Sequence, residues 1–219
     1  MTAKFTDFAM FHLYAAQTFA LRSHALEATG DRNNDGESRS CVLSSIIVSV
    51  CFLEASINQL FMFHQKLPGI DVRLLFAGIP EEIGNTLHDL WAADIDNLSI
   101  LSKYNLVLAA SQKEALQQDA NPFQDAKALI GLRNAIVQYK EGWLADGQTH
   151  PMERKLKGKF PINALAAGHD LGFYPAECLG YGCAKWACTS AKSLVDQFYQ
   201  RLAVTRPYAN YVHLNVEWP

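Results

Sequence analysis

Residues 41–63 read CVLSSIIVSVCFLEASINQLFMF and form the most apolar stretch of the sequence. Its apolar residues recur at spacings of three and four, which predicts a helix with one wide apolar face. Glu54, Asn58 and Gln59 interrupt the stretch, so only about 13 residues run without a strongly polar group, whereas a membrane span needs roughly 20. The stretch therefore predicts a helix buried in a protein core.

The same periodicity continues along most of the chain. No segment alternates as a surface strand does, and no fixed-period repeat is visible. The sequence therefore predicts an all-α bundle of about five helices with long irregular connectors, forming a single domain over residues 1–219. The segment 206–219 is expected to be an extended tail packed on the helices. Helical patterns cover about 5–28, 41–63, 81–91, 96–118, 122–140 and 175–202.

Composition excludes several classes of protein. The chain has 219 residues, is 49% hydrophobic and 19% charged, and so is expected to be globular and not disordered or collagen-like. A net charge of −3 argues against a broad basic surface for duplex DNA or for an anionic membrane. Five cysteines, an odd number, together with no leader-like start, predict free thiols, a cytoplasmic location and no membrane partner.

The motifs of common metal and cofactor sites are missing. No HExxH or CxxC occurs, and the residues Cys178, Cys183 and Cys188 recur every five positions, so a helix would not bring them to one face. The glycine pair Gly180 and Gly182 lacks the preceding strand of a nucleophile elbow or a dinucleotide site. We therefore expect no metal and no cofactor.

One loop resembles half of a calcium site. The stretch Asp31–Gly36, DRNNDG, matches the first half of an EF-hand loop, but Val42 stands where the closing bidentate Glu belongs. A solvated turn is the simpler interpretation, and any binding of Ca²⁺ is expected to be weak. Whether this loop binds a cation stays open.

The segment LIGLRNAIVQYK, residues 129–140, carries the candidate functional residues. At helical spacing the guanidinium of Arg133 lies beside an apolar stripe, and a buried Arg needs acceptors because it cannot lose its charge. The buried helix expected over 41–63 offers Glu54 and Asn58, four residues apart. We predict that Arg133 pairs with Glu54, and that Asn58 and Asn134 complete the hydrogen bonds.

Around Arg133 the sequence resembles the HEPN superfamily of helical proteins. The resemblance includes Leu132-Arg133-Asn134, Ser56-Ile57-Asn58 after Glu54 on the second long helix, Lys103-Tyr104, and Lys185-Trp186 on the last helix. It implies an RNA-binding protein or a metal-independent endoribonuclease. It also implies a dimer in which an Arg, followed after four to six residues by a His, lines a cleft between protomers.

The sequence departs from this family pattern at the His. Gln138, Tyr139 and Lys140 occupy the positions where the His is expected. A glutamine forms hydrogen bonds but does not transfer a proton near neutral pH. We therefore expect a catalytically degenerate HEPN-like module, and not an enzyme, that binds RNA, a nucleotide or a protein partner. Its expected site residues are Arg133, Asn134, Gln138, Glu54 and Asn58.

Two alternatives stay open. The first is an active metal-independent endoribonuclease of toxin or defence type, which would recruit His64 or another His from elsewhere in the fold. The second is a purely structural dimerisation protein, in which the network of Arg133, Glu54 and Asn58 only fixes the register of the helices. The expected partners are RNA or a nucleotide, a second copy of the chain, and a protein such as a cognate antitoxin.

Overall fold

The structure is a computed structural model that describes residues 8–61, 79–92, 95–138, 148–167 and 172–219. These residues form α-helices joined by turns, and none of them is in a strand. The all-α prediction is therefore confirmed. The described ranges contain seven α-helices, where about five were expected. The short α3 matches the helical pattern predicted over 81–91, and α6 lies in an expected connector. The helices are α1 (Phe8–Glu27), α2 (Asp35–Phe61), α3 (Glu81–Ala92), α4 (Ile100–Ala110), α5 (Phe123–Val137), α6 (Pro151–Leu156) and α7 (Tyr181–Leu202).

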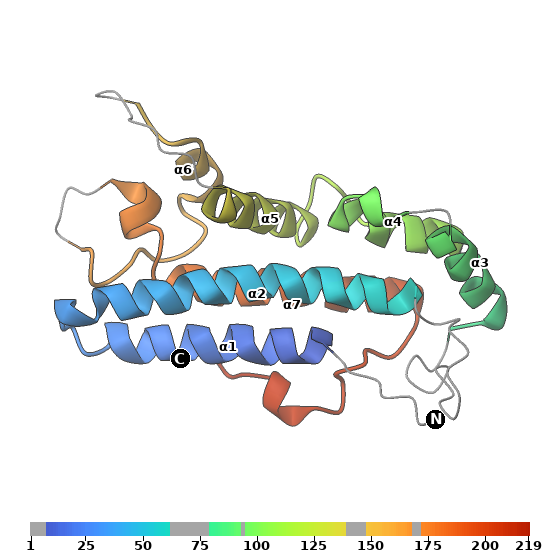
Figure 1. Cartoon of the computed structure of the whole chain (residues 1–219), viewed down its shortest axis with the longest axis horizontal. Coiled ribbons are helices and arrows are strands. Elements are labelled where there is room, and N and C mark those ends of the chain that lie inside the picture. Colours follow the sequence, from blue (N-terminus) through green and yellow to red (C-terminus); the bar gives the residue numbers. More distant parts are fainter. Residues whose placement is uncertain (1–7, 62–78, 93–94, 139–147, 168–171) are drawn as a thin grey trace.

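Three long helices, α1, α2 and α7, contact one another along their length and form the body of the bundle (Figure 1). The shorter helices α3, α4 and α5 follow one another along α2, on the side away from α1 (Figure 1). Both α4 and α5 contact α2 and α7. The segment after α7 returns along α1, where the Gln17 Nε2 donates a hydrogen bond of 3.0 Å to the Leu214 carbonyl.

The central helix, α2, is the apolar stretch of the sequence. Six of its apolar side chains are fully buried, because α1, α7 and the shorter helices surround it. The helical run Arg32–Phe61 is long and apolar enough to cross a membrane by length and composition, and 56% of its most apolar window is buried inside the fold. The prediction of a buried helix is confirmed. The fully buried residues are Val42, Ile46, Phe52, Leu53, Ile57 and Leu60.

The start of α2 lies within residues 29–40, which the predicted helical patterns over 5–28 and 41–63 left outside any helix. A short helical turn, η1 (Arg32–Asn34), is capped by Asp31, and α2 begins directly after it at Asp35. Asp35 pairs with Arg39 one helical turn later, at 2.7 Å, and also accepts a hydrogen bond of 3.1 Å from Asn163. These carboxylates thus stabilise helix starts. Among the described residues, no group of three or more His, Cys, Asp or Glu side chains is placed to hold a metal ion.

Two other boundaries differ from the predicted ones. The helix expected over 96–118 ends at Ala110, and two residues later Gln112 adopts a left-handed conformation with φ of 54° that an α-helix does not continue through. The helix expected to begin at residue 175 begins at Tyr181, because a single turn over Phe173–Glu177 precedes it and an extended Gly180 separates the two.

The glycines Gly180 and Gly182 allow the start of α7 to approach the segment 161–163. A Cβ on Gly180 would lie 2.5 Å from the Asn163 Cα, and a Cβ on Gly182 would overlap the Pro161 carbonyl oxygen. Both obstacles are backbone atoms, which cannot move aside as a flexible side chain can. The glycine pair noticed in the sequence therefore serves close packing.

We expect Gly182→Ala to lower the free energy of unfolding by about 2 kcal/mol, because the added methyl group forces the backbone of 161–163 away from α7. Urea unfolding followed by circular dichroism measures this change. The matched control is Gly131→Ala in α5, where nothing lies within 4 Å of an added Cβ. This control should gain about 0.5–1 kcal/mol from helix propensity. Equal effects of the two substitutions would contradict the close-packing explanation.

Candidate functional site

The predicted site residues lie on α2 and α5, which contact each other. Arg133 is half-buried near the end of α5, and Glu54 is exposed on α2. Both charges act on the thiol of Cys51. Burial raises the pKa of Cys51 most, the positive charge of Arg133 lowers it, and the negative charge of Glu54 raises it. The structure therefore brings Arg133 and Glu54 to the neighbourhood of the same thiol.

The predicted ion pair between Arg133 and Glu54 is wrong. No ion pair joins these two side chains in the ranges that the structure describes. The physical reason is the exposure of Glu54, since a carboxylate at the surface keeps its hydration and gains little from a nearby cation. Glu54 and Arg133 thus lie near each other but do not form an ion pair.

The guanidinium of Arg133 has an unsatisfied donor. Its Nε is buried and has no hydrogen-bond partner among the described residues. A buried N–H without an acceptor costs about 1–3 kcal/mol, and the cost is greater when the group is charged. Arg133 therefore keeps hydrogen-bonding capacity that an incoming acceptor could use.

The buried cation that α2 does bind is Lys103. Its side chain is only 2% exposed on α4, and its Nζ donates a hydrogen bond of 3.1 Å to the Asn58 Oδ1. The next residue, Tyr104, is fully buried and its hydroxyl donates to the Leu53 carbonyl at 2.8 Å. Asn58 was predicted to form a hydrogen bond with Arg133, but the structure shows that it binds Lys103. The sequence signal for this contact was a lysine within the apolar pattern of the helix predicted over 96–118.

Asn134 and Gln138 occupy the end of α5 beside Arg133. The Gln138 backbone N–H donates to the Asn134 carbonyl at 2.9 Å and closes the last turn of the helix. Asn134 is half-buried, whereas the Gln138 side chain is exposed. Tyr139 and Lys140 lie outside the described residues, as does His64. The three residues Arg133, Asn134 and Gln138 thus share one helix end.

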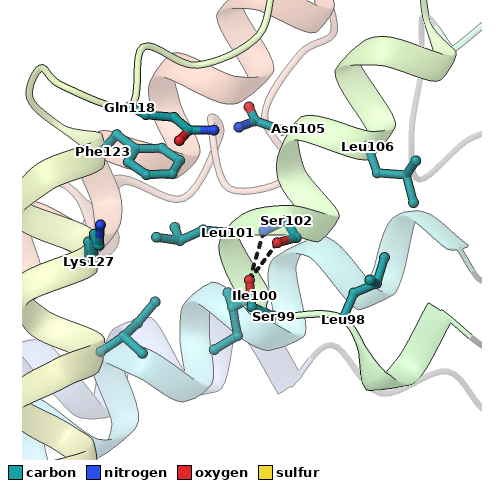
Figure 2. Close-up of a pocket in the computed structure, with 11 residues that line it drawn as sticks. Leu98, Ser99, Ile100, Leu101, Ser102, Asn105, Leu106, Gln118, Phe123 and Lys127 are labelled. Atoms are coloured by element: carbon teal, nitrogen blue, oxygen red, sulfur yellow. Dashed lines mark hydrogen bonds between the residues drawn. The ribbon is translucent and has the colours of Figure 1, made fainter.

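A pocket of about 700 Å³ lies between α4 and α5, and sequence reasoning missed it (Figure 2). Its wall is apolar where Leu101 and Phe123 face each other, and the exposed Lys127 stands beside Phe123 on α5. Lys127 precedes Arg133 by six residues, so their Cα atoms lie about 9 Å apart along the helix axis and about 120° apart around it. The rim is polar, with Ser99, Ser102, Asn105 and Gln118.

No family model, curated protein or solved structure matches this chain. Function is therefore inferred from the residues of the site alone. The structure places an unsatisfied guanidinium and two amide side chains at one end of α5. The apolar pocket with a second cation lies between α4 and α5, and none of these three residues lines it.

Proposed function

We propose that the protein is a HEPN-like helical module that binds RNA or a nucleotide through Arg133. The observation that carries the proposal is the half-buried guanidinium of Arg133, whose Nε has no partner within the described part of the chain. Arginine stays charged at any physiological pH, and its planar N–H groups match two phosphate oxygens. A phosphate at Arg133 would satisfy the buried donor and would also supply the negative charge that Glu54 does not.

The neighbouring pocket suits the rest of a nucleotide. A base stacked against Phe123 would use the apolar wall, and Lys127 would meet a second phosphate along α5. The amides of Asn134 and Gln138 can donate to the sugar or to the same phosphate. Because the net charge of the chain is −3, we expect this local contact to support short single strands and not a long duplex.

The proposed module does not cleave its ligand. Efficient cleavage needs a group that transfers a proton, and losing such a group lowers the rate by about 10²- to 10⁴-fold. Gln138 cannot fill that role, and no hydrogen bond joins Arg133 to a histidine within the described ranges. An endoribonuclease that recruits His64 remains the alternative function.

We expect Arg133→Met to weaken the binding of a fluorescein-labelled single-stranded RNA at least tenfold in anisotropy titrations. The slope of log K against log salt should fall by about 0.7, as expected for one lost phosphate contact. The same variant should be as stable as the wild type or more stable by about 1 kcal/mol, because methionine keeps the packing and removes the unsatisfied donor.

The matched control for this titration is Arg22→Met, which removes an exposed arginine from the distant helix α1. Its affinity for the RNA should stay within twofold of the wild type. Wild-type protein that does not bind the RNA, or an Arg133→Met variant with unchanged affinity, would contradict the proposal. Unfolding of Arg133→Met, with no RNA binding by the wild type, would favour the purely structural alternative.

Incubation of the protein with labelled RNA and no added metal separates binding from cleavage. The proposal predicts no product beyond that of a mock preparation. Products that disappear in Arg133→Met would support the endoribonuclease instead.

We further propose that a second copy of the chain is a partner and that the two copies meet through α1. Large apolar side chains repeat along the outer face of α1, where Phe8, Phe11 and Tyr14 are 60%, 64% and 53% exposed. The ring of Tyr14 contacts His213, and the neighbouring Val212 is 83% exposed, so the apolar surface extends onto the returning segment. None of these side chains carries a full charge that would repel its copy.

We expect Phe11→Glu to convert a dimer into a monomer in sedimentation-velocity experiments, because it places a carboxylate in the middle of this surface. Ile162→Glu is the control, since Ile162 is also exposed but lies outside α1. A wild-type monomer at every concentration would contradict the dimer and would leave the surface to a different protein, such as a cognate antitoxin.

We also propose a cytoplasmic location. All five cysteines are free thiols, four of them buried. Free thiols fit a reducing compartment.

A further inference from the structure

A second cavity, of about 580 Å³, lies at the end of the bundle where α1 ends and α7 begins. We call it the α1–α7 cavity. Its wall consists of the last turn of α1, the first half of α7, the segment 159–164 and Pro219. A volume of this size holds one small organic molecule and is too small for an oligonucleotide. None of the candidate residues on α2 and α5 lines it.

Aromatic rings form much of the wall. The rings of His24 and Tyr181 are 4.5 Å apart between centroids, and those of Phe160 and Trp186 are 5.3 Å apart. All four residues line the cavity. Aromatic rings of this kind pack well against another planar ring, either face to face with an offset or edge to face.

Lys185 brings a positive charge to the cavity. Its Nζ donates a hydrogen bond of 3.0 Å to the main-chain oxygen of Pro219 and lies 5.8 Å from the centroid of the Tyr181 ring. No ion pair joins Lys185 to an Asp or Glu side chain in the described part of the chain. The other cavity lysine, Lys159, is neutralised by Asp125 at 2.5 Å. Lys185 is therefore the cation that a bound anion would meet.

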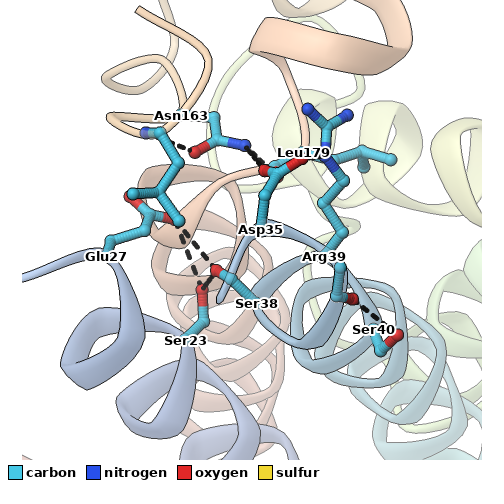
Figure 3. A network of polar contacts seen from close by, with 10 residues as sticks. Ser23, Glu27, Asp35, Ser38, Arg39, Ser40, Asn163 and Leu179 are labelled. Atoms are coloured by element: carbon cyan, nitrogen blue, oxygen red, sulfur yellow. Dashed lines mark hydrogen bonds and ion pairs between the residues drawn. The ribbon is translucent and has the colours of Figure 1, made fainter. Parts of the chain in front are cut away.

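The acidic residue of the cavity is already engaged. Glu27 accepts hydrogen bonds from the hydroxyls of Ser23 and Ser38 (Figure 3). It also accepts from the backbone N–H groups of Ala164 and Tyr181. Its carboxylate thus joins α1 to α2, to the start of α7 and to the segment 159–164. Glu27 holds the walls together, and its charge is spread over four donors.

Trp186 adds an unused donor. Its side chain is 8% exposed, and its Nε1 is buried without a hydrogen-bond partner among the described residues. A buried indole N–H normally finds an acceptor. Trp186 lines the cavity, and its indole N–H is a donor that no described residue uses.

We propose that the α1–α7 cavity binds a small planar aromatic or heteroaromatic molecule that carries an anionic group. The ring packs among Phe160, Tyr181 and Trp186, and the anion meets the ammonium of Lys185. An acceptor atom on the ligand takes the indole N–H of Trp186. This site is independent of Arg133, so the protein has one surface for RNA and a separate cavity for a small molecule.

Calorimetric titration with two probes of the same ring tests the proposal. The probes are 2-naphthoate, which is anionic, and 2-naphthylmethylammonium, which is cationic. We expect one 2-naphthoate per chain and at least tenfold weaker binding of the cation. Lys185→Met should abolish this preference for the anion. Trp186→Phe should weaken 2-naphthoate several-fold, because it keeps a ring and removes the N–H.

Lys157→Met is the charge control, because Lys157 is 69% exposed and does not line the cavity. Thermal melting of each variant checks that it is folded. The proposal is overturned by wild-type protein that binds neither probe, by equal affinities for the two probes, or by a folded Lys185→Met variant that still prefers the anion.

Discussion

Glu27→Ala should lower the free energy of unfolding by about 3 kcal/mol, the combined loss of several hydrogen bonds to a charged acceptor. Gly180, at the cap position of α7, has no side chain to bind the first N–H groups of that helix. Glu27 supplies the missing cap from α1, through the N–H of Tyr181. The substitution therefore weakens the start of α7 as well as its attachment to α1. Urea unfolding by circular dichroism measures the loss.

Glu37→Ala is the matched control for Glu27→Ala. Glu37 binds Arg22 at 2.6 Å, but the two side chains are 53% and 57% exposed. A surface pair of this kind contributes about 0–1 kcal/mol. Glu27→Gln, which keeps an acceptor oxygen, should recover part of the stability. If Glu27→Ala costs no more than Glu37→Ala, Glu27 does not hold the start of α7.

Asn58→Leu should cost about 2–3 kcal/mol, because it removes one acceptor of the buried ammonium of Lys103. Lys103 is 2% exposed, so water cannot replace the lost oxygen without opening the packing between α2 and α4. Asn58→Asp keeps an oxygen at this position and should be far less harmful. The midpoint of urea unfolding gives the difference.

The double variant Asn58→Leu with Lys103→Met tests whether these two side chains interact energetically. If the two side chains interact, the double variant should lose less stability than the sum of the losses of Asn58→Leu and Lys103→Met. Strictly additive losses would show that Asn58 and Lys103 do not interact energetically.

The sequence predicts the helical class well because periodicity reports burial directly. The apolar run after residue 41 predicts the central helix, α2, and that helix is buried as expected. Boundaries were less predictable, because they depend on contacts distant in sequence. Asp35 begins α2 while bound to Asn163, which lies 128 residues away. α7 begins where Glu27 meets Tyr181, 154 residues apart.

The candidate site could be predicted only in part. The pattern around Arg133 places a cation beside α2, and the structure agrees on that neighbourhood. The sequence pattern could not reveal that Glu54 is exposed to solvent. Helical periodicity shows which residues share a face of one helix, but it does not show how that helix packs against another. Asn58 was therefore assigned to the wrong cation, because its side-chain oxygen accepts a hydrogen bond from Lys103 and not from Arg133. The two pockets are lined by side chains from several segments that lie far apart in the sequence, so no local sequence pattern predicts them.

The side-chain Nε–H resonance of Arg133 tests the proposed function most directly. In ¹⁵N-correlated NMR spectra it is identified as the peak that disappears in Arg133→Lys. Our account predicts that titration with single-stranded RNA shifts this peak downfield and slows its exchange with water, because a phosphate oxygen accepts the Nε–H. A peak that stays unchanged while the RNA is bound, or while RNA is present in large excess without binding, would contradict the account.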